Sequence, residues 1–178
     1  MVNFKDFFNL NGYEVYIIGG CGLIGSQIVN ALKEYGAKIT VFDLDIKRKR
    51  KRNSPKVKYV KFDCSKEKNI KNFFTYYIKQ NKCPDVFINA SYPATKDWKK
   101  NTFKEINFSS YKKNIELHLN SYVWIAKSIA DQMLKNKIQG SIIQLSSMYG
   151  IVAQDNNLYK NTNISENMTY GIIKSSTI

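Results

Sequence analysis

Three glycines separate an apolar run from an amphipathic helical pattern near the start of the chain, and no other feature constrains the fold as strongly. Residues 13–18 predict a buried strand, and Gly19, Gly22 and Gly25 follow it before the helical pattern begins. Gly19 permits a tight turn, Gly22 lets a phosphate approach the backbone, and Gly25 allows close packing of helix on strand. The helix then offers free N–H groups to an anion. This order predicts a dinucleotide-binding unit, although turns without a ligand also contain such glycines.

An acidic residue at the end of the second predicted strand extends the expected cofactor site. Asp43 lies eighteen residues after Gly25. A carboxylate there accepts hydrogen bonds from an adenosine ribose and repels a 2′-phosphate, which favours NAD over NADP. The basic run 47–52 leaves NADP open, since one of its side chains could fold back to a phosphate. We expect the pyrophosphate to lie against Gly19, Cys21, Gly22, Leu23, Ile24 and Gly25.

Short apolar runs bounded by turn residues recur along the chain, and helical patterns lie between them. Near-continuously apolar strands in such an alternation predict the α/β class, with a doubly wound parallel sheet of the Rossmann type. The length of 178 residues predicts a single domain over 1–178. The strands are expected at 13–18, 37–42, 57–62, 85–89 and 141–145.

Two helices can be placed from periodicity. The first is expected at 22–35 and ends at Gly36. The longest is expected at 109–137, where its apolar stripe is either core or subunit interface. The buried face of the first helix is expected to carry Ile24, Ile28, Ala31 and Leu32, and the stripe of the longest Ile115, Leu119, Tyr122, Ala126, Ile129 and Met133.

Composition bounds the class of protein. No apolar run approaches the length of a membrane span, and the amino terminus lacks the apolar stretch of a signal peptide, so we expect a cytoplasmic protein. The three cysteines are an odd number and have no Cys-x-x-Cys spacing, which argues against a disulfide framework and against a zinc site. A net charge of +14 would suit nucleic acid, but lysines occur along the whole chain. We therefore interpret most of this charge as solvated surface.

Four further segments, in order along the chain, resemble the short-chain dehydrogenase/reductase family. They are residues 62–64, 89–91, 146–150 and 170–174. The resemblance implies an NAD(P)-dependent oxidoreductase that interconverts an alcohol and a ketone or aldehyde. It places Asp63 and Cys64 at the adenine ring, and it places Asn89, Ala90 and Ser91 beside the cofactor at the end of the fourth strand.

The same resemblance implies a catalytic group of Ser147, Tyr170 and Lys174, with Lys174 also contacting the cofactor. Tyr170 and Lys174 are four residues apart, so they share one face of a helix. A neighbouring ammonium favours the phenolate form of a tyrosine, which can then exchange a proton with the substrate oxygen. Ser147 can hydrogen-bond that same oxygen.

Two departures from the family pattern stand out. His118 occupies the position of the usual catalytic asparagine, where it could hold a water near Lys174 or be a satisfied, partly buried side chain. Asn114 and Asn120 are the alternative candidates for the asparagine's role. The spacing of twenty-three residues from Ser147 to Tyr170 exceeds the usual one. The polar insert 153–168 is expected to cover the substrate pocket as a lid, or to be a tolerated surface excursion.

Within the family, the motifs resemble oxidoreductases of bacterial flagellin and surface-glycan modification loci, which implies a sugar-derived substrate. Tyr92, Met148, Tyr149 and the insert would then line its pocket. An alternative is an extended-type sugar-nucleotide epimerase or dehydratase, whose loop the glycine spacing matches well. A non-catalytic nucleotide-sensing or nucleic-acid-binding protein is the alternative from another class.

The family continues beyond the Tyr170 helix through two more strands. We therefore expect the Rossmann domain to be C-terminally incomplete in this sequence, which we interpret as a fragment of a longer chain. The helices at 109–137 and around Tyr170 commonly build subunit interfaces in this family. The resemblance thus implies a homo-oligomer for the complete protein.

Overall fold

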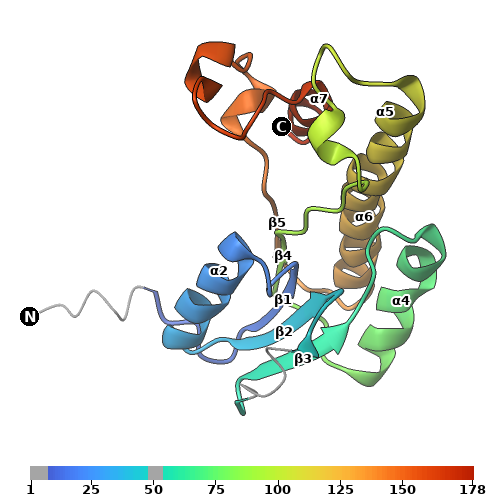
Figure 1. The fold of residues 1–178 in the computed structure, drawn as a ribbon. Coiled ribbons are helices and arrows are strands. Elements are labelled where there is room, and N and C mark those ends of the chain that lie inside the picture. Colours follow the sequence, from blue (N-terminus) through green and yellow to red (C-terminus); the bar gives the residue numbers. More distant parts are fainter. Residues whose placement is uncertain (1–7, 48–53) are drawn as a thin grey trace, which may run out of the picture.

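The computed structural model describes residues 8–47 and 54–178. Most of the basic run 47–52, which leaves NADP open, lies outside the described residues. The described chain forms a five-stranded sheet with the order β3-β2-β1-β4-β5, and every neighbouring pair is parallel (Figure 1). The strands are β1 (Glu14–Ile18), β2 (Lys38–Asp43), β3 (Val57–Lys61), β4 (Val86–Asn89) and β5 (Ser141–Gln144). Their bounds agree with the predicted ones to within one residue.

Helices cover both faces of this sheet, as the doubly wound prediction requires. Figure 1 shows α2 (Leu23–Glu34) on one face, with α4 (Glu67–Gln80) and α6 (Asn120–Lys135) on the other. Strand side chains alternate between the faces. Val15 and Ile17 of β1 pack toward α2, whereas Tyr16 and Ile18 pack toward α4 and α6.

Aromatic side chains dominate the core beneath α4. Phe74 is fully buried, and its ring centroid lies 5.4 Å from that of Phe42 and 5.3 Å from that of Phe62, in edge-on contacts. Edge-to-face pairs add to the free energy gained by burying apolar area. This cluster fixes α4 on the sheet, and thereby the loop between β3 and α4.

The buried face of α2 agrees with the predicted one in part. Ile28 and Leu32 pack against the core beside the buried Val29, whereas Ile24 is 61% exposed and Ala31 is also exposed. The first turn of α2 borders a groove, so Ile24 faces that groove and not the sheet. The predicted stop is confirmed, because Gly36 has a φ of +99° directly after the helix.

The longest predicted helix is interrupted by a π turn. The segment consists of α5 (Phe108–Asn114), the π-helical η2 (Ile115–Leu119) and α6. A π turn inserts one extra residue into a helix and is frequent at functional sites. Of the predicted stripe, Tyr122, Ile129 and Met133 are buried, and Ile125 joins them. Residues 115 and 119 are only partly buried, because the π turn changes the register at this point.

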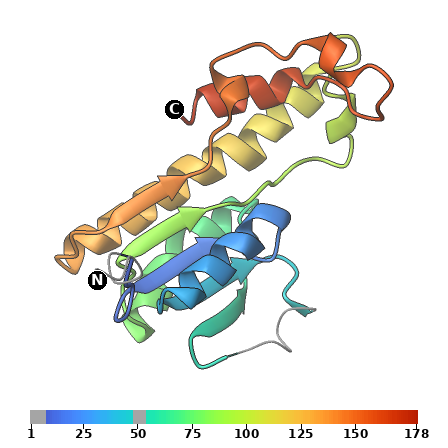
Figure 2. The ribbon, with the colours of Figure 1, turned by 90° about the vertical axis from the view of Figure 1, so that its left-hand side faces the viewer.

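The last described helix, α7 (Met168–Ser175), packs beside η2 beyond the carboxyl ends of the strands (Figure 2). Three short 3₁₀ turns complete the described elements: η1 (Trp98–Lys100), η3 (Met148–Gly150) and η4 (Asn156–Tyr159). Within residues 8–47 and 54–178, no helix has the length and apolar character that crossing a membrane demands.

Candidate active site

A groove of about 900 Å³ runs along the carboxyl ends of the strands. The strand order turns back between β1 and β4, and open α/β sheets bind ligands at such a crevice. The groove gathers most of the predicted site residues, although they come from distant parts of the sequence. Its walls include Gly19, Cys21, Gly22, Leu23, Ile24, Gly25, Asp43, Asp63, Cys64, Ala90, Ser91, Tyr170 and Lys174.

The glycine loop has the close contacts that its sequence predicts. Gly19 has a φ of +76°, and a Cβ built on it would lie 2.6 Å from the Ala90 carbonyl oxygen. A Cβ on Gly25 would overlap the Gly19 carbonyl oxygen. Gly22 is less crowded, since its Cβ would lie 3.2 Å from that same oxygen. Gly19 and Gly25 therefore shape the loop, while Gly22 leaves space on the groove side.

The first turn of α2 is open to an anion. Gly22 is the N-cap residue, so no side chain accepts a hydrogen bond from the first N–H groups, and no acidic residue lies in the first turn. Such a helix end carries a partial positive charge and unpaired donors. A phosphate group in the groove would satisfy both.

The Asp43 carboxylate is held at the side of this loop. Its Oδ2 accepts a hydrogen bond from the Cys21 N–H at 2.9 Å, and its Oδ1 accepts one from the Asp45 N–H at 3.3 Å. Both acidic residues line the groove. A fixed carboxylate at this place can accept hydrogen bonds from the hydroxyls of an adenosine ribose, and it disfavours a 2′-phosphate on that ribose.

The loop after β3 forms the adjoining wall. Asp63 accepts hydrogen bonds from the Ser65 N–H at 3.1 Å and its hydroxyl at 2.6 Å, and it pairs with Lys66. Burial raises the pKa of the Asp63 carboxyl, but the Ser65 hydrogen bonds and Lys66 outweigh it and hold the pKa below its usual value. Burial raises the pKa of the neighbouring Cys64 to about 11, so this residue is a neutral thiol at neutral pH.

Asn89 lies beneath the groove and does not line it. Its side chain is fully buried, and its Oδ1 accepts hydrogen bonds from the Ser91 N–H at 3.2 Å and the Ser91 hydroxyl at 2.7 Å. The Tyr122 hydroxyl donates to the Ser91 carbonyl at 2.8 Å. Asn89 thus shapes the turn whose residues Ala90 and Ser91 reach the groove.

Lys174 is set apart from the other lysines. It is 3% exposed, whereas every other described lysine whose side-chain burial is known is exposed. Its ammonium donates to the Leu145 carbonyl at 2.6 Å and lies 4.9 Å from the Tyr122 ring centre and 5.8 Å from the Tyr170 ring centre. Loss of hydration on burial lowers the pKa of Lys174 to about 8. The structure therefore brings a readily deprotonated amine beside Tyr170.

Ser147 does not line the groove. It is the N-cap residue of η3, and its hydroxyl accepts a hydrogen bond from the Tyr149 N–H at 3.2 Å. The neighbouring Ser146 lines the groove and donates its hydroxyl to the Lys174 carbonyl at 2.7 Å. The strand end that carries Ser147 is thereby tied to α7.

His118 lies in the π turn, fully buried against aromatic rings. Its ring centroid is 5.1 Å from that of Tyr92 and 5.0 Å from that of Tyr122. Neither imidazole nitrogen has a hydrogen-bond partner among the described residues. Burial, reinforced by Lys174, lowers the pKa of His118 to about 3, so the ring is neutral at neutral pH. Asn114 and Asn120 are the other candidates for the role of the catalytic asparagine. Asn114 is buried and hydrogen-bonded to Thr95 and Asn101, and Asn120 is exposed.

The insert 153–168 contributes no residue to the groove walls. It contacts the segment after β4 instead, where the Glu166 carboxylate accepts from the Phe103 N–H at 3.2 Å and Asn167 Nδ2 donates to the Trp98 carbonyl at 2.9 Å. Tyr92 does line the groove, but Met148 and Tyr149 do not. The insert therefore does not cover the groove as a lid in this structure. Its hydrogen bonds hold it against the loop that contains Trp98 and Phe103.

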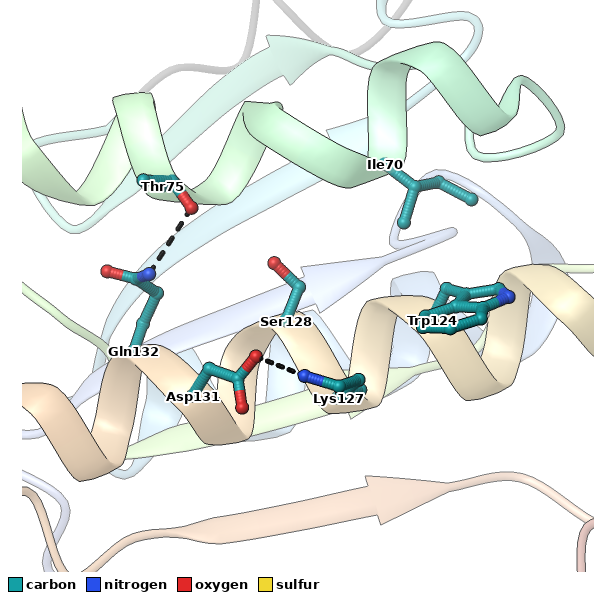
Figure 3. Close-up of a pocket in the computed structure, with 7 residues that line it drawn as sticks. All are labelled: Ile70, Thr75, Trp124, Lys127, Ser128, Asp131 and Gln132. Atoms are coloured by element: carbon teal, nitrogen blue, oxygen red, sulfur yellow. Dashed lines mark hydrogen bonds and ion pairs between the residues drawn. The ribbon is translucent and has the colours of Figure 1, made fainter.

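A second hollow, of about 330 Å³, lies between α4 and α6 on the outer face (Figure 3). Gln132 Nε2 donates to the Thr75 hydroxyl at 3.3 Å, and Lys127 pairs with Asp131 at 2.6 Å. Its remaining lining residues are Ile70, Trp124 and Ser128. None of the predicted site residues reaches this hollow.

The chain forms a Rossmann-type α/β domain. Its parallel strands carry helices on both faces, its glycine loop lies where the strand order turns back, and a buried lysine lies beside a tyrosine. Residues 14–159 match the short chain dehydrogenase profile, and the chain belongs to this family.

Two curated relatives share about a quarter of their residues with the chain. Post-translational flagellin modification protein A of Campylobacter coli is 26% identical over 168 residues, which cover 90% of this chain and 65% of that protein. L-fucose dehydrogenase of Bos taurus is 26% identical over 146 residues, covering 80% and 52%. The chain thus spans between about half and two thirds of their lengths.

Solved structures show the same fold at lower identity. A short chain dehydrogenase of Leptospira borgpetersenii with bound NAD⁺ superposes with a TM-score of 0.81 at 22% identity, covering 98% of this chain and 64% of that one. A gluconate 5-dehydrogenase of Burkholderia cenocepacia, in complex with NADP and tartrate, gives 0.78 at 16% identity, covering 98% and 65%. These likenesses support the Rossmann-type fold.

Sequence reasoning missed several groove residues. Leu44 and Asp45 directly follow β2, Leu117 lies in the π turn, and Ser146 follows β5 by two residues. Three of these positions had a usable signal, because residues just past the carboxyl ends of parallel strands meet at one edge of the sheet. Leu117 had none, since the π turn that exposes it to the groove is not visible in the apolar periodicity.

Proposed function

We propose that the protein is an NAD-dependent oxidoreductase that interconverts an alcohol and a ketone or aldehyde. The observation that carries this proposal is the groove itself, which joins an open helix N-terminus and the Asp43 carboxylate to the Tyr170–Lys174 pair. The first two features fit a dinucleotide, and the third fits proton exchange with a substrate oxygen. A groove of about 900 Å³ accommodates both molecules.

The cofactor would lie along the glycine loop, with its phosphates at the first turn of α2. Gly22 leaves space there, and the residues lining the adjoining wall, Asp63 and Cys64, would flank the adenine ring. Asp43 would accept hydrogen bonds from the ribose hydroxyls and favour NAD over NADP. When bound, the nicotinamide accepts or supplies the hydride.

The proton side of the reaction belongs to Tyr170 and Lys174. Tyr170 exchanges a proton with the substrate oxygen, and the Lys174 ammonium lies 5.8 Å from the centre of its ring. Burial keeps this ammonium close to its titration range, so it can return the proton to the phenol. Ser147 holds the substrate oxygen with its hydroxyl.

We assign His118 the place of the missing asparagine. A neutral imidazole carries one donor and one acceptor nitrogen, and both are unsatisfied and buried next to Lys174. Unpaired buried polar atoms are costly unless a water or a reacting group uses them. A water between His118 and Lys174 would satisfy one of them and pass protons from the ammonium, which favours the relay over a purely structural histidine.

The substrate is proposed to be sugar-derived. The names of relatives support this class, since they include an L-fucose dehydrogenase, a gluconate 5-dehydrogenase and a flagellin modification protein. Tyr92, 49% exposed, lines the groove with its ring centroid 5.9 Å from that of Tyr170. An aromatic face beside the reacting oxygen suits the C–H face of a sugar ring. The complete protein remains expected to be a cytoplasmic homo-oligomer.

Nucleotide binding tests this proposal first. NADH and NADPH are titrated into the wild type, Asp43→Ala and the control Asp155→Ala, whose exposed carboxylate lies in the insert. We expect NADH to bind the wild type and the control alike, and Asp43→Ala to bind it about tenfold more weakly because hydrogen bonds to a charged group are lost. A folded wild type that binds neither nucleotide would contradict the proposal.

Turnover distinguishes the dehydrogenase from the epimerase or dehydratase alternative. NAD⁺ is mixed with L-fucose and with gluconate, and NADH formation is followed by absorbance in the wild type and in Tyr170→Phe. A dehydrogenase forms NADH in proportion to substrate, and the Phe variant, which lacks the exchangeable proton, loses about a hundredfold or more in rate. Conversion of a sugar nucleotide without net NADH formation would favour the alternative.

A further inference from the structure

Three buried polar side chains outside the proposed chemistry meet beside the first turn of α7. Asn101, Asn114 and Thr169 are each 0% exposed. They come from three separate segments, namely the loop after η1, the end of α5 and the start of α7. Thr169 is more than fifty residues from the other two, so the fold brings α7 to this pair.

Asn101 is the centre of this network. Its Oδ1 accepts a hydrogen bond from the Thr169 hydroxyl at 2.8 Å and from Asn114 Nδ2 at 3.3 Å. Its Nδ2 donates to the Ser110 hydroxyl at 2.9 Å and to the Asp97 carbonyl at 3.3 Å. The Asn101 backbone carbonyl also accepts from the Met168 N–H at 2.9 Å.

Asn114 ties the network to the segment that carries Tyr92. Its Oδ1 accepts from the Thr95 N–H at 2.9 Å, and its Nδ2 donates to the Thr95 hydroxyl at 2.8 Å and the Ser110 carbonyl at 2.9 Å. Both oxygens and both nitrogens of the two amides are therefore satisfied. Rotation of either amide by half a turn would place donors against donors.

Because every polar atom of the Asn101 and Asn114 amides is paired, we interpret the network as a device that positions the joined segments more than one that stabilises the fold. A buried hydrogen bond gives only a small net gain after the cost of lost hydration, and apolar side chains of similar volume can pack about as stably. Hydrogen bonds add direction, because a satisfied network admits only one arrangement of the segments that it joins. Two of those segments lead directly into the site, since Thr169 precedes Tyr170 and Asn114 precedes the π turn with His118.

We propose that Asn101, Asn114 and Thr169 are positioning residues that fix the phenol of Tyr170 relative to Lys174 and to the loop carrying Tyr92. The inference rests on the proposed function, in which Tyr170 exchanges the proton. A misplacement of about 1 Å in a reacting group can cost about a hundredfold in rate, so a directional clamp at this helix turn has catalytic value.

The test uses the 178-residue chain with ¹³C-labelled tyrosine rings. Tyr170→Phe assigns the Tyr170 signals, which report the position of its ring beside Tyr92. Thr169→Val removes only the hydroxyl that binds Asn101, and Thr169→Ser restores one. Thr75→Val is the matched control, because it deletes a hydroxyl acceptor in the distant hollow of Figure 3. NADH affinity is measured for each variant.

We expect Thr169→Val to shift the Tyr170 signals by more than their linewidth, Thr169→Ser to return them, and the control to leave them in place. NADH affinity should stay within about twofold throughout, because the nucleotide wall of the groove is untouched. Thr95→Val removes an acceptor from Asn114 and should shift the same signals by a smaller amount. If Thr169→Val does not fold, the presence or absence of this smaller shift tests the positioning role.

Unchanged Tyr170 signals in a folded Thr169→Val chain would overturn the positioning role, as would a shift that Thr169→Ser does not reverse. Failure of the proposed function has a different signature. In that case neither the wild type nor the variants bind NADH, while the Tyr170 signals still respond to the Thr169 hydroxyl.

Discussion

Lowering the pH from about 7.5 to about 5 is expected to destabilise the folded chain through His118, its only histidine. In the unfolded chain an imidazole takes up a proton below its reference pKa of about 6.5. In the folded chain, burial and the neighbouring Lys174 lower the pKa of His118 to about 3, so it stays neutral at both pH values. Tyr92 and Tyr122 surround the ring and offer no negative charge at these pH values.

The magnitude follows from proton linkage. The unfolded state binds more protons than the folded state below pH about 6.5, so stability falls as the pH falls. Each unit below that value costs about 1.4 kcal/mol, which gives a loss of about 2 kcal/mol at pH about 5. The result depends little on the folded-state value, because pH 5 still lies well above about 3.

Urea unfolding followed by the fluorescence of Trp98 and Trp124 measures this loss in the wild type and in His118→Phe. The carboxylates titrate alike in both proteins, so the difference between their pH dependences isolates the imidazole. The wild type should lose about 2 kcal/mol more than the variant. Equal losses in the two proteins would refute the reasoning, because they would show that His118 takes up a proton within the folded chain.

Three further substitutions test the loop and the core. Gly25→Ala places a Cβ against the Gly19 carbonyl, so NADH binding should be lost and urea unfolding should show a loss of about 1–3 kcal/mol. In Gly22→Ala the new Cβ would lie 3.2 Å from the Gly19 carbonyl oxygen, so the free energy of unfolding should change little. The methyl group would face the phosphates, so NADH binding should weaken in a fluorescence titration. Equal destabilisation by the two substitutions would contradict the different roles assigned to these glycines. Phe74→Ala removes a fully buried ring from the aromatic cluster and should cost about 3–5 kcal/mol in urea unfolding, whereas a cost below about 1 kcal/mol would show that the cluster rearranges to fill the space.

The sheet could be predicted from the sequence because its signals are local. Each strand is a short apolar run bounded by turn residues, and the structure reproduces the five predicted runs to within one residue. Gly36 is another local signal, since a helix stop with positive φ strongly favours glycine. The alternation of strands and helices then predicts a parallel sheet with right-handed crossovers, whereas the strand order comes from the structure.

The errors occur where a side chain's surroundings come from distant segments. Ile24 is apolar, and periodicity alone assigns it to the core, but the groove beside the first turn of α2 leaves it 61% exposed. The insert 153–168 was expected over the groove because of its place between Ser147 and Tyr170. Its actual position depends on hydrogen bonds to Trp98 and Phe103, more than fifty residues earlier in the chain.

The candidate site divides in the same way. Gly19 and Asp43 could be placed in one groove because each follows a predicted strand, and Lys174 could be placed there through the family resemblance. The partners of Asn101 and Asn114 could not be foreseen, since asparagine is common in this sequence and no spacing marks a network. The burial of His118 was left open for a related reason, because its exposure depends on the rings of Tyr92 and Tyr122.

The π turn also sets how this helix can change in length. A π turn holds one more residue than the α turn it replaces, so deleting one residue from Ile115–Leu119 would restore regular α-helical geometry with α5 and α6 in nearly their present relative rotation. Asn114 would then still reach Asn101, and the change would fall on His118, whose place in the turn depends on the extra residue. Deleting one residue from α6 would instead rotate the two ends of the helix by about 100° relative to one another. Homologues should therefore tolerate a change of one residue inside Ile115–Leu119 more readily than a change of one residue in α6.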